Sequence, residues 1–391
     1  MFTMTHTYDF NNIGIDIDNI CNTSNYENAL NLCVKYYIYN NEKYKFIKYD
    51  KVKLNSNNYN TIGLFRSFLC KNNKIVCFAP PKSVEFEKFT SSHIECECVA
   101  QEYIEGTMIN IFYDIENQDW EIATKSTVGG KVNYFNTNKM LFRQMFLEAC
   151  IHCNLEFDNL NKELCYSFVM QHPNNHIVIP ITETKLYLVA CYKINNSNKT
   201  IQAIDVNSTK NYFNNIKIYY PRQYIFDNFE QLHEIVDKLD MDSYVGLMIH
   251  HHSTGERTKL RNSKYEYVKK LRGNQAKLQF RYLELRVSKE IKEYLYYFPE
   301  TTYLFNKYES EIHNFTNNLH NYYVNCFISK QIKLKDHPYE YRLNMYELHN
   351  QYINTLKPKK QTITKKYVID YINSLPPAKL MFAINYEKRL T

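Results

Sequence analysis

The sequence predicts an α+β fold, in which a domain built on antiparallel sheets is followed by a smaller all-α domain. Two patterns indicate this order. Between Tyr44 and about Arg286, short runs of β-branched and aromatic residues alternate with turn residues. After about Ser288, apolar residues recur at intervals of three and four instead. The expected domains are therefore 1–287 and 288–391, and 44% hydrophobic residues in a chain of 391 are sufficient for substantial cores.

The predicted strands are short and lie in the first domain. The segment from Asp114 to Asp119 is mostly polar and separates two apolar runs, so it is expected to be a hairpin loop between antiparallel strands. The full set of predicted strands is Ile75 to Phe78, Met108 to Tyr113, Trp120 to Thr124, Leu164 to Met170, His176 to Ile179, Lys185 to Tyr192, Thr200 to Asp205 and Tyr244 to Ile249.

Helices are expected where the apolar interval is three or four. In the first domain these segments are Tyr26 to Tyr39, Lys139 to Cys153 and Phe226 to Leu239. In the second domain one apolar stripe runs from Tyr308 to Ser329, and another begins at Met345 and ends at Leu356.

Two more helices are predicted near the C-terminus. Thr364 is a suitable N-cap for the first of them. Pro376 and Pro377 separate it from a last helix that begins near Ala378, since proline is favoured at a helix start.

The composition narrows the classes of protein. The 36 Tyr, 23 Phe and single Trp, with frequent Asn, Ile and Lys, are typical of an AT-rich genome. The formal net charge of +7 permits contact with a polyanion. Dedicated nucleic-acid-binding domains usually have a pI above about 9, however, and the pI of this chain is about 8.6. Charge alone therefore assigns no partner.

The 11 cysteines lack disulfide-like spacing, and no secretory signal pattern or apolar run of about 20 residues is present. We expect a protein without membrane contact in the cytoplasm, that of the host cell if it is viral. The pairs Cys96 with Cys98 and Cys150 with Cys153 do not have zinc-knuckle spacing and are interpreted as buried thiols.

Only eight glycines occur, and six of them lie in four short segments, where we expect a functional site. Upstream of these segments, Arg66 precedes a predicted strand and Lys82 follows it. The four segments are Ile104 to Thr107, Ser126 to Gly130, Tyr244 to Leu247 and Ser253 to Gly273. Tyr103 and Lys125 directly precede the first two, and Lys259-Leu260-Arg261 lies within the last.

Taken in order, these stretches resemble the motifs of ATP-dependent RNA ligases of the bacteriophage tRNA-repair type, members of the covalent nucleotidyltransferase superfamily. The resemblance covers about Gly63 to Leu271. It implies that Arg66 and Lys82 grip a triphosphate and that the K-x-D-G-S motif begins at Tyr103. In the family the lysine of that motif attacks the α-phosphorus of ATP and carries AMP.

The same resemblance shows which groups are replaced. Tyr103 occupies the position of the nucleophilic lysine, and Val169 and Val245 occupy those of two glutamates that serve the ribose and the metal. Lys259 and Arg261 match the K-x-K motif. The resemblance thus implies nucleotide binding by Arg66, Lys82, Glu105, Gly106, Lys259 and Arg261, with ATP and Mg²⁺ as cofactors and RNA or a nucleotide as partner.

Three functions follow from this pattern. The first is a degenerate RNA-ligase-like protein that binds nucleotide or RNA ends without self-adenylylation, because the usual nucleophile and metal ligands are missing. The second is an active ATP-dependent RNA end-joining ligase that uses a relocated lysine, Lys82 or Lys125. The third is a non-catalytic structural or scaffold protein of a virus.

Two further features remain open. His250-His251-His252 with Glu256 could form a substitute metal site. Consecutive residues on a strand face opposite sides, however, so at most His250 and His252 share a side, and a solvated polar strand end is the simpler interpretation. The C-terminal region resembles the tails of ligase-like proteins of large DNA viruses. Its helices would then help to select the RNA partner.

Overall fold

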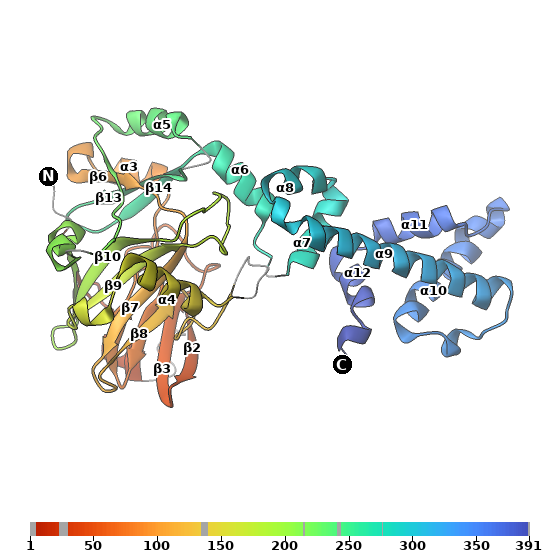
Figure 1. The fold of residues 1–391 in the computed structure, drawn as a ribbon, viewed down its shortest axis with the longest axis horizontal. Coiled ribbons are helices and arrows are strands. Elements are labelled where there is room, and N and C mark those ends of the chain that lie inside the picture. Colours follow the sequence, from red (N-terminus) through yellow and green to blue (C-terminus); the bar gives the residue numbers. More distant parts are fainter. Residues whose placement is uncertain are drawn as a thin grey trace. The chain divides into compact units, whose positions relative to one another are not determined.

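The structure is a computed structural model that describes residues 5–22, 30–133, 140–213, 216–240, 244–275 and 277–389 (Figure 1). The chain divides into two compact units, Met1–Lys270 and Leu271–Thr391, and the division falls within helix α6 (Ser263–Arg272). The predicted domains 1–287 and 288–391 place the boundary later, and as folding domains they remain a prediction.

The first unit contains, in its described part, one six-stranded and two four-stranded sheets, and all neighbouring strands pair antiparallel. The six-stranded sheet has the order β1 (Thr7–Asp9), β11 (Thr200–Ile204), β10 (Lys185–Asn195), β9 (Leu164–Gln171), β7 (Thr107–Asp114) and β8 (Asp119–Thr124). One four-stranded sheet has the order β12 (Gln223–Tyr224), β6 (Cys98–Glu102), β13 (Gly246–His251) and β14 (Arg257–Arg261). The other has the order β2 (Leu32–Tyr39), β3 (Glu42–Tyr49), β4 (Phe68–Lys71) and β5 (Lys74–Phe78).

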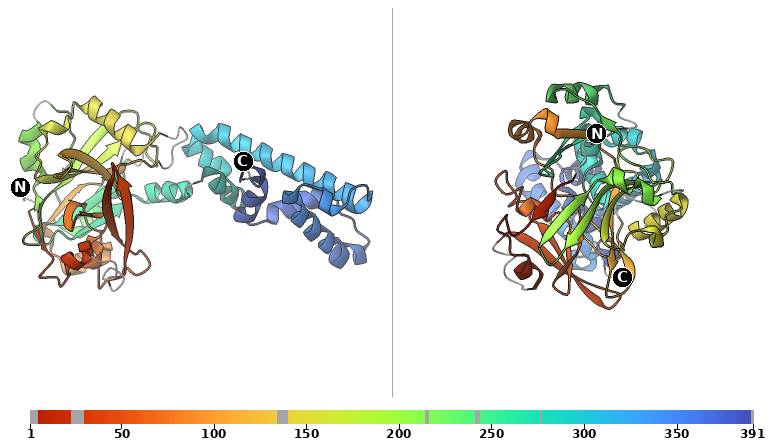
Figure 2. Two further views of the ribbon diagram at one scale, coloured as in Figure 1. Left: turned by 90° about the horizontal axis from the view of Figure 1, so that it is seen from below. Right: turned by 90° about the vertical axis from the view of Figure 1, so that its left-hand side faces the viewer.

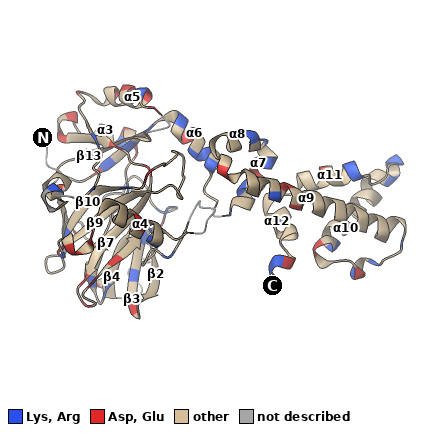
Figure 3. Ribbon diagram, in the orientation of Figure 1, with Lys and Arg blue, Asp and Glu red and all other residues tan. Residues whose placement is uncertain are grey.

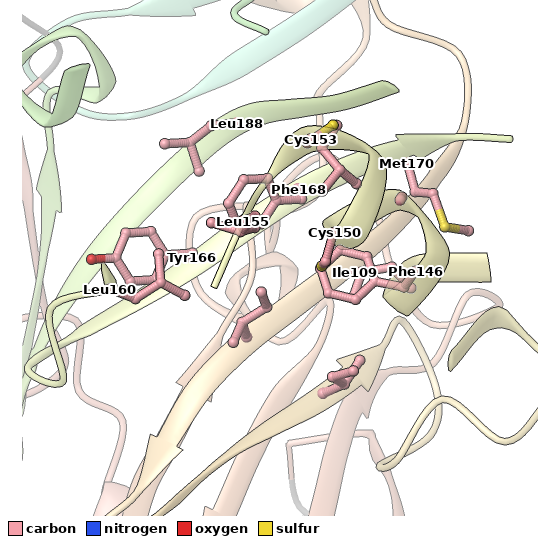
Figure 4. Packing of buried hydrophobic residues seen from close by; sticks show 14 of the residues in the cluster. Ile109, Phe146, Cys150, Cys153, Leu155, Leu160, Tyr166, Phe168, Met170 and Leu188 are labelled. Carbon is pink, nitrogen blue, oxygen red and sulfur yellow. The ribbon is translucent and has the colours of Figure 1, made fainter. Parts of the chain in front are cut away.

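One hydrophobic core lies between the six-stranded sheet and α4 (Phe142–Cys153), as Figure 4 shows. Phe146 and Cys150 of the helix pack with Phe168 and Tyr166 of β9. Burial of each large apolar side chain contributes about 1.5–3 kcal/mol, so this contact fixes α4 on the sheet. A separate cluster joins the β12-β6-β13-β14 sheet to α3 (Phe86–Ser92) and α5 (Phe229–Lys238).

The predicted fold class is confirmed, and most predicted strands are present, including the hairpin between β7 and β8. The strand predicted at His176 to Ile179 is wrong, because this segment is a loop. The helix predicted at Tyr26 to Tyr39 is wrong over its last eight residues, which form β2, while residues 23–29 lie outside the described residues. Asn40 and Asn41 both have positive φ, which closes a tight hairpin from β2 to β3.

The second unit is helical. It contains α7 (Leu278–Ser288), α8 (Ile291–Tyr297), α9 (Thr302–Tyr323), α10 (Tyr339–Gln351), α11 (Lys365–Ser374) and α12 (Pro377–Ile384). The long helix α9 packs against α7, α10, α11 and α12 (Figure 2). Its predicted stripe is confirmed, since Ile312, Phe315, Leu319 and Tyr323 are buried. Thr364 caps α11 as predicted, because its side chain accepts a hydrogen bond from the Tyr367 N–H at 3.2 Å.

No helix among the described residues is both long and apolar enough to cross a membrane. The cysteine prediction is confirmed for Cys98, Cys150 and Cys153, which are buried, and is wrong for Cys96, which is exposed. Neighbouring residues do not cover Cys96, because it lies in a short 3₁₀ turn, Glu95–Glu97, that has no buried residue.

Candidate functional site

Backbone hydrogen bonds bring together the segments that carry the predicted site residues. The Lys82 N–H donates to the carbonyl of Gly63, beside Arg66, at 2.9 Å. The Tyr103 N–H donates to the carbonyl of Gly246 at 2.9 Å, which ties the end of β6 to the start of β13. The first contact places Lys82 near the segment that carries Arg66, and the second places Tyr103 beside the β13–β14 pair that carries Lys259 and Arg261.

A cavity of about 540 Å³ lies where several of these segments meet. Arg66, Gly106 and Lys125 line it, and Arg66 and Lys125 are its charged residues. The remaining lining residues are Ser67, Ala79, Thr107, Met108, Thr124, Ser126, Val132, Asn133, Phe142, Asn175 and Ile177. The polar groups, with two cations and no carboxylate, form a suitable environment for an anionic ligand.

Gly106 is required by close packing at the cavity wall. Its φ is +152°, and a Cβ there would lie 2.4 Å from the backbone oxygen of Met170 and 2.8 Å from a methyl carbon of Val169. The loop after Tyr103 can therefore approach β9 only with glycine at this position. Gly106 thus shapes the cavity wall by its lack of a side chain.

The cations are close enough for their charges to affect one another. Desolvation and then the charge of Arg66 lower the pKa of Lys125 to about 8, although part of this side chain is open to solvent. Burial and then Arg261 lower the pKa of Lys259 to about 8, with smaller effects from Lys82 and Lys269. Burial is the larger cause of both changes, and the neighbouring cations add to it, although Arg261 is already paired with the Glu266 carboxylate. A bound anion would stabilise the positive charge that remains.

Lys82 belongs to the same positive region. Burial, followed by the charges of Arg66 and Arg257, lowers its pKa. Its ammonium nitrogen lies 5.1 Å from the ring centroid of Tyr59, donates to the carbonyl of Ser83, and therefore has a fixed direction. Lys82 does not line the cavity described above, so the structure brings it to the cationic group but not to the cavity wall.

Tyr103 and Arg261 form a pair within the positive region. Arg261 donates from Nη2 to the Tyr103 hydroxyl at 3.1 Å, and its guanidinium carbon lies 5.2 Å from the tyrosine ring centroid. Burial would raise the pKa of Tyr103, but Arg261, Lys259 and Lys269 lower it to about 8. The phenol therefore ionises far more readily than an ordinary tyrosine.

Glu105 is held by protein groups on both oxygens. The Tyr265 hydroxyl donates to Oε1 at 2.6 Å, and the backbone N–H groups of Val178 and Ile179 donate to Oε2 at 3.2 and 2.8 Å. Burial raises the pKa of Glu105, although these hydrogen bonds oppose the change. The side chain fastens the loop after β9, which is the more direct explanation for its burial than contact with a ligand.

The other two acid positions are apolar. Val169 and Val245 are both buried, at 7% and 2% exposure. Neither side chain offers an oxygen. The carboxylates that the resemblance would require are therefore absent at both positions.

Two cations that the sequence analysis missed belong to this region. Arg257 is buried and donates from Nε to the carbonyl of Pro81 at 2.8 Å and from Nη2 to that of Pro80 at 3.0 Å. It therefore positions the turn that precedes Lys82. Lys269, on α6, has its pKa lowered by burial and by Arg261. The sequence did contain a signal for Arg257, because Arg257, Lys259 and Arg261 alternate at i, i+2 and therefore lie on one face of a strand.

The histidine run is not a solvated strand end. His251 is buried and its Nε2 lies 3.0 Å from Oε2 of Glu97, while its ring stacks on that of His93 with centroids 4.1 Å apart. His93 in turn lies 2.6 Å from Glu256. Among the residues that the structure describes, no group of three or more His, Cys, Asp or Glu side chains is arranged to hold a metal ion.

No protein-family model matches the chain. A curated relative, the "Immediate-early protein ICP-46 homolog" of Invertebrate iridescent virus 3, is 25% identical over 231 residues. The alignment covers 56% of this chain and 48% of the relative, so the chain matches about half the length of that protein.

Solved structures of RNA ligases show low similarity to this chain. An archaeal ATP-dependent RNA ligase (form 2) is 11% identical with a TM-score of 0.41, covering 64% of this chain and 62% of that chain. A Naegleria gruberi RNA ligase mutant with ATP and Mn is 10% identical with a TM-score of 0.36, covering 52% of this chain and 64% of that chain. In both, the chain covers less than two thirds of the known protein, and neither comparison assigns a function.

Proposed function

We propose that this protein binds the phosphates of a nucleotide or an RNA end in a ligase-like nucleotidyltransferase domain and does not form a covalent lysine adduct. The observation that carries the proposal is the gathering of Arg66, Lys82, Lys125, Lys259 and Arg261 within reach of one another's charges. The motif positions that would supply the nucleophile and two carboxylates hold Tyr103, Val169 and Val245 instead.

Electrostatics favour a polyphosphate here. Each charge-assisted hydrogen bond to a phosphate contributes roughly 1.5–3 kcal/mol, and mutual repulsion among the cations is relieved when the anion binds. Arg66 and Lys125 would contact the phosphates from the cavity wall. Lys259 and Arg261 would add charge from β14, beside Tyr103.

A protein-held Mg²⁺ does not fit the described residues. Mg²⁺ takes oxygen ligands, usually one or two carboxylates together with phosphate oxygens. The valines offer none, and both oxygens of Glu105 already accept hydrogen bonds from protein groups. We therefore propose ATP as a ligand whose binding does not require a metal held by this chain.

A binding experiment tests the proposal. ATP and a 5′-phosphorylated RNA oligonucleotide are titrated against the wild type and against the double variant Arg66→Ala/Lys259→Met, with and without Mg²⁺. We expect binding to the wild type in EDTA and a loss of at least about tenfold in the variant, which corresponds to about 1.4 kcal/mol. Equal binding by both proteins would refute the site, and no binding by either would favour the scaffold function.

An active ligase is the second candidate, and Lys125 is the observation in its favour. It lines the cavity, and its pKa of about 8 leaves a larger fraction of free amine than in an ordinary lysine. Its Nζ would attack the α-phosphorus of ATP, a P–N bond would form, and pyrophosphate would leave as the amine proton passes to solvent. A labelled adduct on a denaturing gel that is lost in Lys125→Ala or Lys82→Ala would establish this function and refute the first proposal.

We also infer a viral origin, which the iridescent virus relative supports, and a place of action in the host cytoplasm. Immunofluorescence of infected cells would test the second point. Exclusively nuclear staining would contradict it.

A further inference from the structure

The positive charge of the chain is unevenly distributed. Residues 271–391 contain 19 Lys and Arg against 11 Asp and Glu, whereas residues 1–270 contain 29 against 30. The formal excess of +7 in the whole chain therefore lies in the helical unit. This is the reverse of what the cation-rich site of the first unit would lead one to expect.

Within the helical unit, the charge is further concentrated by two stretches without an acidic residue, 312–335 and 348–369. Together they contain eight lysines: Lys330, Lys333, Lys335, Lys357, Lys359, Lys360, Lys365 and Lys366. All eight are exposed, and within the described part of the chain none of them forms an ion pair with an acidic residue.

The two stretches meet at the same end of the helix bundle. The rings of Phe327 and His349 stack with centroids 3.9 Å apart, and the Tyr323 hydroxyl lies 3.5 Å from Nδ1 of His349. Burial and the charge of Lys365 lower the pKa of His320, which places the start of α11 beside α9. Figure 3 shows the lysines of residues 357–366 as blue segments at the start of α11 and in the turn before it.

We propose that the surface formed by Lys330, Lys357, Lys359, Lys360, Lys365 and Lys366, called the lysine tip below, binds the phosphate backbone of a nucleic acid without reading its sequence. Lysine offers a mobile point charge that suits single phosphates, whereas base recognition favours the planar fork of arginine, which this surface lacks. Because its lysines are exposed and the two stretches contain no acidic residue, a polyanion can approach several lysines together. The proposal rests on the charge distribution and is independent of the site in the first unit.

The test compares two triple charge reversals in the full-length protein. One is Lys357→Glu/Lys359→Glu/Lys360→Glu in the tip. The matched control is Lys277→Glu/Lys292→Glu/Lys307→Glu, three exposed lysines of the same unit that lie outside the tip. Both change the net charge equally. Binding of poly(U) RNA with 5′-hydroxyl ends is measured as a function of salt, so that recognition of a terminal phosphate is not involved.

We expect the tip variant to bind at least about tenfold more weakly at low salt, and its salt slope to be smaller by about two, since each single-strand phosphate contact contributes about 0.7. The control should keep the wild-type slope. Equal losses in both variants would overturn the proposal, because the net charge of the unit would then account for binding.

Two further arms complete the test. A neutral tip variant, with the same three lysines changed to Gln, should show the same direction of change, and its thermal unfolding should match that of the wild type. Anionic phospholipid vesicles serve as the competing polyanion, since four exposed isoleucines (Ile328, Ile332, Ile353 and Ile369) lie in the same stretches. Tip-dependent binding to vesicles without tip-dependent binding to RNA would overturn the nucleic-acid assignment. Loss of RNA binding in Arg66→Ala/Lys259→Met alone, with the tip variant unaffected, would do the same.

Discussion

Replacing Arg261 with methionine should raise the pKa of Tyr103 from about 8 to its ordinary value of 10 or above. The shift of about two pH units corresponds to a preference of about 3 kcal/mol for the phenolate, from 1.36 kcal/mol per unit. Arg261 is the main source of this preference, since it contacts the hydroxyl at 3.1 Å and opposes the effect of burial. Without it, burial dominates, and Lys259 and Lys269 compensate only in part.

The assay is the phenolate absorbance between pH 7 and 11. The absorbance of the matching Tyr103→Phe variant is subtracted from that of each protein, so that the contribution of the other 35 tyrosines cancels. The free energy of unfolding should depend on pH through the same ionisation of Tyr103. Because the folded pKa is the lower one, the contribution of Tyr103 is fully present above pH 10 and is lost as the pH falls through 8. Tyr265→Phe is the control, since it removes a neighbouring phenol whose pKa is raised. A step near pH 8 that persists in Arg261→Met would refute the assignment of the shift to Arg261.

Three further predictions concern the same site. Gly106→Ala should destabilise the folded state by more than about 1 kcal/mol in urea unfolding, because the added Cβ meets the Met170 carbonyl oxygen, and an unchanged midpoint would contradict this geometry. Glu105→Ala should cost at least about 1–3 kcal/mol by the same measurement, since the buried N–H groups of Val178 and Ile179 lose their acceptor, and full stability would show that these bonds are dispensable. ATP affinity should fall as the pH rises through 8, where Lys259 and Lys125 lose their protons, and Lys259→Arg should reduce this decline because arginine does not titrate there. Isothermal titration at pH 7 and 9 checks it, and a pH-independent affinity would be the contrary outcome.

The fold class was predictable because it depends on local patterns. The stripe on α9 and the hairpin at β7 and β8 follow directly from apolar spacing and turn residues. The strand at Leu32–Tyr39 could not be predicted in this way, because its aromatic and aliphatic residues fit a helical interval equally well. Its conformation is set by pairing with β3, which the turn at Asn40 and Asn41 brings alongside. Pairing of this kind is a tertiary effect that a single segment does not reveal.

The candidate site was partly predictable. The motif order indicated Arg66 and Lys259, and their charges do lie close to those of Lys82 and Lys125. What the sequence could not reveal is which charged groups serve the fold itself. Arg257 and Glu105 both form hydrogen bonds with backbone groups of other segments, and only the three-dimensional contacts show this.

One sample analysed in two ways separates nucleotide binding from covalent attachment. Wild-type protein is incubated with α-labelled ATP and Mg²⁺, half is measured for bound nucleotide at equilibrium, and half is denatured and separated on a gel. We expect saturable binding that Arg66→Ala/Lys259→Met weakens, with no label on the denatured chain. A labelled chain, or binding that the double variant leaves unchanged, would contradict this expectation.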